Sequence, residues 1–174
     1  MLQIPAQRSC AVLRVVGRVD DELLCRLAQL AAELTGAQTL VQRGKLKVDA
    51  VKGGMYAVET IEIDGCETTV TSTNDFGIAA VVGMNVTDAT LNVTAPNGTG
   101  ITAAAKMNVT DAKLNVTAAK EAIATRNLSM EGTEAVLDMT GEDGFAVSVL
   151  KDESGEGNVK LNQSDVTVTS RNGG

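Results

Sequence analysis

The chain has 174 residues, with 22 Asp and Glu against 15 Lys and Arg, and it contains no His and no Trp. The lack of His excludes Ser-His catalysis, histidine metal ligands and phosphohistidine carriers. With two Phe, one Tyr and a net charge of -7, a module that stacks nucleic-acid bases is not expected. The hydrophobic fraction of 44% predicts an aliphatic core.

The charge is unevenly distributed along the chain. Residues 1–53 carry eight Lys and Arg against five Asp and Glu, a net charge of +3, and residues 54–174 carry seven against seventeen, a net charge of -10. The two values sum to -7 and predict two regions with different surfaces. The acidic region argues against DNA and anionic membranes as partners.

The beginning of the chain does not resemble a targeting segment. No stretch approaches 18 continuous apolar residues, so no transmembrane helix is expected. The first apolar run is short and is interrupted by Arg14, which makes it a poor signal peptide. We therefore expect a cytoplasmic or virion protein. The chain has three cysteines, Cys10, Cys25 and Cys66. Their odd number and wide spacing indicate buried thiols rather than zinc ligands or disulfides.

Residues 1–53 predict a small α+β head with the order strand, helix, strand, strand. The first strand falls at residues 10–16. The helix begins near Asp20 and ends near Gly36, with four leucines on one face that indicate core packing or, alternatively, a seam for a partner helix. Those leucines are Leu23, Leu27, Leu30 and Leu34. Residues 39–42 and 46–50 then predict a hairpin around Gly44.

A 23-residue repeat dominates the rest of the chain. MNVTDATLNVTA at residues 84–95 and MNVTDAKLNVTA at residues 107–118 are identical at eleven of twelve positions. Extending the same period outwards gives four repeats and a degenerate fifth over residues 54–174. Apolar residues alternate with polar ones within each repeat, which is the period of a strand. The first column of apolar positions contains Ile61, Met84, Met107 and Met130.

These features predict a mainly β fold, a β-solenoid built from 23-residue repeats and capped by the small α+β head. Residues 54–170 resemble the coils of right-handed parallel β-helices and of viral tail spikes. That resemblance leaves open coils of a single chain or an intertwined trimer. Duplicated antiparallel hairpins are a further alternative. The last residues, 170–174, predict a frayed end rather than a cap, which favours end-to-end stacking or a trimeric tip.

Residues 11–59 resemble HPr-like phosphocarrier domains. The resemblance rests on the strand-helix-strand order and on the segment GKLKVDAVKGGMYAVE at residues 44–59. The position of the phosphorylated His of that family falls at residues 17–20, which read GRVD, and the regulatory Ser is replaced within residues 51–53, VKG. The resemblance therefore implies an inert or binding version of the phosphocarrier fold.

Two kinds of polar column stand out as candidate sites. Asp88, Asp111 and Glu134 share one repeat position, so stacked strands would align their carboxylates in a ladder able to bind Ca²⁺. The alternative is that they are turn residues facing solvent. The pairs Asn85/Asn108 and Asn92/Asn115 predict stacked amide ladders with a structural role.

No catalytic constellation and no cofactor motif emerges from the sequence. We therefore expect a non-enzymatic structural protein that self-assembles, as a homo-oligomer or with other subunits of a virion, tail spike or filament. The alternatives are a module that binds a protein or carbohydrate partner, and an HPr-like regulatory protein without phosphocarrier activity.

Overall fold

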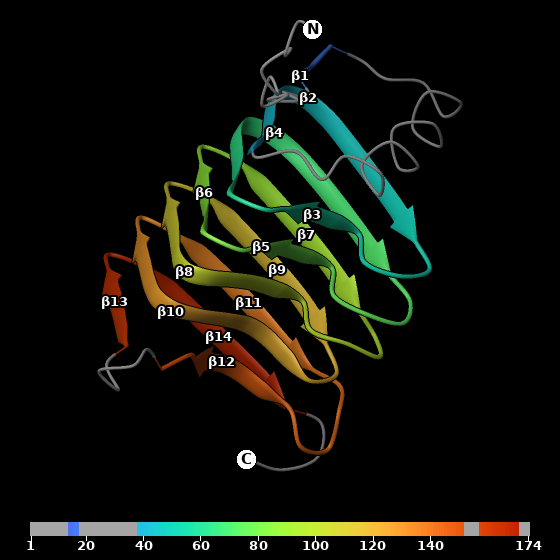
Figure 1. Cartoon of the computed structure of the whole chain (residues 1–174). Coiled ribbons are helices and arrows are strands. Elements are labelled where there is room, and N and C mark those ends of the chain that lie inside the picture. Colours follow the sequence, from blue (N-terminus) through green and yellow to red (C-terminus); the bar gives the residue numbers. More distant parts are fainter. Residues whose placement is uncertain (1–13, 18–37, 152–156, 171–174) are drawn as a thin grey trace, which may run out of the picture.

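The computed structural model describes residues 14–17, 38–151 and 157–170, and these residues form a 14-stranded sheet wound into a parallel β-solenoid (Figure 1). Every strand pair in it is parallel. The strands are β1 (Arg14–Gly17), β2 (Gln38–Ala50), β3 (Met55–Ala57), β4 (Thr60–Ser72), β5 (Ile78–Ala80), β6 (Gly83–Thr87), β7 (Thr90–Ala95), β8 (Ile101–Thr110), β9 (Lys113–Ala118), β10 (Glu121–Glu131), β11 (Glu134–Met139), β12 (Phe145–Val149), β13 (Asn158–Asn162) and β14 (Asp165–Ser170).

Each coil that the structure describes completely contributes one strand segment to each of three faces. The first face stacks β3, β5, the start of β8, the start of β10 and β12. The second face stacks the first halves of β2 and β4, then β6, the ends of β8 and β10, and β13. The third face stacks the remainder of β2 and β4, then β7, β9, β11 and β14.

The alternation of apolar and polar residues places aliphatic side chains inside the solenoid. Strand β7 alternates buried and more exposed positions, and its buried residues Leu91, Val93 and Ala95 stack on those of neighbouring coils. The third-face pairs Leu91–Leu114 and Val93–Val116 follow the 23-residue offset. The parallel coils and their repeat are thus confirmed, and the antiparallel hairpins are excluded for the described strands.

Small residues let the coils close tightly at the start of each repeat. A Cβ atom added to Gly77 would collide with Val93 Cγ1 and would lie 2.7 Å from the Gly100 carbonyl oxygen. Gly54 and Gly100 meet the corresponding valines and backbone oxygens in the same way. Because the space is already filled, this corner accepts only the smallest side chains.

The predicted hairpin within residues 39–50 is wrong. Residues 38–50 form one strand, β2, which pairs in parallel with β4 from Gln38 opposite Thr60 to Ala50 opposite Ser72. The solenoid therefore includes residues that the sequence assigned to the head, and no α+β head is seen among the described residues. The predicted helix lies outside the described part of the chain. Gly44, with φ of 122°, sits at the bend between two faces rather than in a hairpin turn.

The assumed constant period fails at the fourth repeat. Met107 pairs with Leu128, an offset of 21, so Met130 stacks on Val109 and not on Met107. In the last coil Asn127 pairs with Asn158, an offset of 31, because the additional residues lie between β12 and β13. Strand pairing tolerates such changes because turns can lengthen or shorten while each strand keeps its inward face.

Candidate functional site

The three carboxylates predicted to form a ladder do not share one column. Asp88 and Asp111 occupy equivalent turns with positive φ angles of 47° and 48°. Gly132, with φ of 60°, takes the next equivalent place, where an added Cβ would collide with Asp111 Oδ1. Glu134 follows on β11 opposite Lys113. Among the described residues, no three acidic or cysteine side chains gather closely enough to hold a metal ion.

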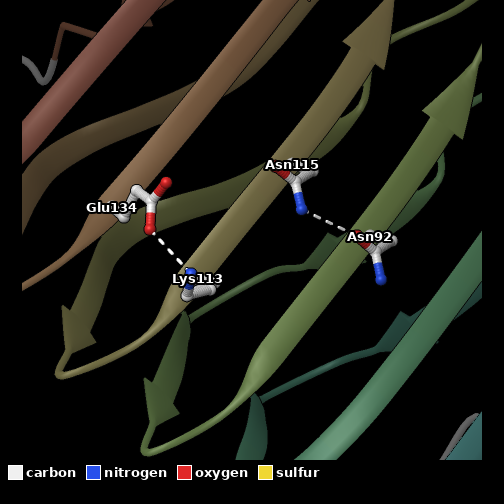
Figure 2. A network of polar contacts seen from close by, with 4 residues as sticks. All are labelled: Asn92, Lys113, Asn115 and Glu134. Carbon is white, nitrogen blue, oxygen red and sulfur yellow. Dashed lines mark hydrogen bonds and ion pairs between the residues drawn. The ribbon is translucent and has the colours of Figure 1, made fainter.

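Glu134 has a cationic partner instead. Its Oε2 lies 2.9 Å from Lys113 Nζ on the adjacent strand (Figure 2). The hydrogen bond from Lys113 to this carboxylate raises the pKa of the ammonium, and the negative charge of Glu134 adds to the effect. Both side chains are well exposed, so the pair fixes the neighbouring coils only weakly.

The asparagine ladders form as predicted. Asn108 Nδ2 donates to Asn85 Oδ1 at 2.9 Å, and Asn115 Nδ2 donates to Asn92 Oδ1 at 2.8 Å. Figure 2 shows the second bond bridging β7 and β9 on the outer surface of the third face. Each ladder links two coils through side chains as well as through the backbone, which supports a structural role.

Cys66 is the cysteine that the structure describes, and it is buried. Its Sγ lies 3.7 Å from the Val41 carbonyl oxygen and 3.5 Å from Thr68 Oγ1. Burial raises the pKa of the Cys66 thiol, an effect larger than the lowering by the hydrogen bond with Thr68. A thiol that resists ionisation is a poor nucleophile, so its environment suits packing rather than catalysis.

An open hollow of about 380 Å³ lies at the corner before the last coil. Its lining combines small residues, acidic residues, one lysine and the exposed Phe145. The lining residues are Ala119, Lys120, Glu121, Gly141, Glu142, Asp143 and Phe145. The hollow therefore adjoins the C-terminal end of the solenoid.

The last coil exposes side chains that continue the interior columns. Val159 pairs with Leu128, Leu161 with Met130, and Val168 with Leu137. The three partners in the preceding coil are at most 2% exposed, whereas Val159, Leu161 and Val168 are 47%, 51% and 54% exposed. Positions that are interior in the preceding coil are therefore exposed to solvent in the last coil.

The same coil presents an unpaired strand edge. Strands β12, β13 and β14 each pair on one side with β10 or β11, and no described strand pairs with their other side (Figure 1). Such an edge, bordered by aliphatic side chains, is a template for another strand. We define the C-terminal edge as β12, β13 and β14, and it is the candidate functional site.

The amino-acid sequence locates this site only in outline. It predicts an uncapped end, but it does not single out the exposed residues, because the fifth repeat does not align without insertions. The alternation VTV within β14 is the available signal. No helix long and apolar enough to cross a membrane occurs in the described part of the chain.

No protein-family model matches the chain, and no curated protein or solved structure shows significant similarity to it. The solenoid assignment therefore rests on the strand pairing itself. No matching family supports the HPr-like resemblance of residues 11–59.

Proposed function

We propose that this protein is a non-enzymatic structural subunit, a β-solenoid rod that self-assembles through its C-terminal edge. The observation that carries the proposal is the exposure of Val159, Leu161 and Val168 at positions whose partners in the preceding coil are interior. Covering them with another strand removes apolar surface from water and satisfies the unpaired backbone groups.

The body of the solenoid suits a mechanical or spacing role. Backbone hydrogen bonds run from coil to coil along all three faces, and the ladders of Asn85/Asn108 and Asn92/Asn115 reinforce two of them. A rod of this kind has a length set by the number of coils. The larger assembly that we propose is a spike or a filament in which other subunits join this rod.

Solution mass as a function of concentration tests the proposal. We expect the wild-type chain to form a species larger than one copy, measured by light scattering or sedimentation. Val168→Lys places a charge in the proposed contact and raises the dissociation constant by at least about tenfold. Val168 is already half exposed at the end of the rod, so the circular dichroism spectrum should be unchanged.

Val81→Lys is the matched control, because Val81 is 47% exposed but lies on the side of the rod. It should leave the association unchanged. A wild-type chain that stays monomeric at all concentrations would contradict the proposal, as would equal association of wild type and Val168→Lys.

A second candidate function is a binding module that uses the side of the solenoid. Val58, Val81 and Val82 are 42%, 47% and 43% exposed along the corner between the first and second faces, and Tyr56 lies nearby on the first face. Backbone bonds connect this corner from coil to coil, including Val82 N to the Glu59 oxygen at 2.9 Å. Loss of association in Val81→Lys rather than Val168→Lys would favour this side.

A further inference from the structure

We infer that the C-terminal edge is covered by the same edge of a second copy, in a tail-to-tail dimer with twofold symmetry. The inference rests on the proposed self-assembly and names its partner and geometry. A twofold axis perpendicular to the solenoid makes the two copies contribute the same surface.

Strand β12 complements itself about Val147. An axis through the middle of the first face sets β12 antiparallel to β12 of the second copy, with Val147 opposite Val147 and Phe145 opposite Val149. Residues directly opposite in an antiparallel pair lie on the same side of the sheet. Phe145 and Val149 are 64% and 38% exposed in one copy, so the pairing gives each an apolar neighbour.

The same axis leaves the solenoid at the corner between the second and third faces, near Gln163. There it sets β13 of one copy antiparallel to β14 of the other. Centring the pairing on this corner places Val159 opposite Val168 and Leu161 opposite Val166. Along the second and third faces, the interior columns of one copy therefore meet the interior columns of the other copy.

The outward residues of this pairing have complementary charge. Lys160 on β13 and Asp165 on β14 are both exposed. In the centred pairing Lys160 lies opposite Thr167 of the second copy, which makes Asp165 of the second copy its diagonal neighbour. Diagonal neighbours lie within reach of a long side chain. The symmetry repeats this attraction, so each dimer contains two such pairs.

In the described part of the chain, the β2 end of the solenoid differs from the C-terminal edge. Strand β1 already pairs with the outer side of β2 opposite Leu40, Val41 and Gly44, on one part of the coil. The last coil of another copy would therefore meet a stepped surface at the β2 end. At the C-terminal edge, β12, β13 and β14 of one coil each lack a described strand on their outer side.

Charge reversal tests the pairing. We expect the wild-type mass to level at two copies. Lys160→Glu and Asp165→Lys should each raise the dissociation constant about tenfold, because each places like charges together twice. The double variant Lys160→Glu/Asp165→Lys should restore the wild-type value. An absence of rescue, or no effect of the single variants, would overturn the inference.

A disulfide at the twofold axis provides a second test. Val147→Cys, in a chain with Cys10 and Cys25 replaced by Ser, should give a dimer under mild oxidation, because both thiols meet at the axis. Val81→Cys in the same background is the control and should remain uncrosslinked.

The outcomes separate this inference from the proposed function. Masses that grow beyond two copies, together with no crosslink in the Val147→Cys variant, would overturn the tail-to-tail pairing while supporting self-assembly. A monomer at every concentration would overturn both.

Discussion

The turn between the second and third faces requires a left-handed residue in every complete coil. The φ angles at this turn are 59° for Gly65, 47° for Asp88, 48° for Asp111, 60° for Gly132 and 49° for Gln163. Glycine accepts this conformation without strain, and Asp tolerates it better than bulkier residues do. The aspartates that suggested a cation ladder are thus explained by backbone geometry.

Two glycines at this turn offer a matched comparison. Gly65→Ala introduces only backbone strain, because nothing lies within 4 Å of the new Cβ, and should cost about 1 kcal/mol of unfolding free energy. Gly132→Ala adds a collision, since its Cβ would meet Asp111 Oδ1, and should cost about 2 kcal/mol. Urea unfolding of both variants measures the difference.

Removing the Asp111 side chain provides the control for this comparison. In an Asp111→Gly background, the cost of Gly132→Ala should fall to that of Gly65→Ala. Equal costs for the two alanine variants in the wild-type background would show that the carboxylate moves aside freely.

Each strand stabilises the solenoid by adding one side chain to each interior column. Leu114 is fully buried between Leu91 and Ala135, whereas Leu161 is 51% exposed in the last coil. Leu114→Ala leaves a cavity bounded by two coils and should cost about 3 kcal/mol. Leu161→Ala should cost less than about 1 kcal/mol in the monomer.

Thermal or denaturant unfolding at a concentration below association measures both leucine variants. Lys160→Glu can supply a monomeric background if association persists. A cost for Leu161→Ala close to that for Leu114→Ala would mean that the last coil is packed as firmly as the middle ones, contrary to its exposure.

A complete solenoid is stabilised mainly by contacts between neighbouring coils. Among the described strands, those of the last coil have a neighbour on one side only, so they should open locally more readily than the central ones. We expect amide hydrogen exchange to be faster in β13 and β14 than in β7 and β9 when the protein is dilute.

Association should then reduce this difference in amide exchange rate between the last coil and the central strands. Raising the protein concentration should slow exchange in β12, β13 and β14 while leaving β7 and β9 unchanged, because only the C-terminal edge becomes covered. Concentration-dependent protection confined to β3 and β5 would instead indicate association through the side of the rod.

The repeat, the alternation and the asparagine ladders follow from the amino-acid sequence alone. Residues 84–95 and 107–118 are identical at eleven positions, so equivalent residues of the two repeats are expected to occupy equivalent places in neighbouring coils. Strand alternation then decides which of their side chains point inward. The contact of Asn92 with Asn115 needs no more than those two facts, because identical residues in stacked coils share a column.

Where the repeats diverge, the stacking of residues depends on how the coils pair in the folded chain. Alternation with a period of two is satisfied equally by an offset of 21 or 23, so it could not show that Glu134 lies beside Lys113 rather than Asp111. Nor could it distinguish a hairpin from the long strand β2, since Gly44 suits both a turn and a bend. Hydrogen bonding between coils selected the register in which their strands pair. That register also decides which side chains of the interior columns are exposed in the last coil.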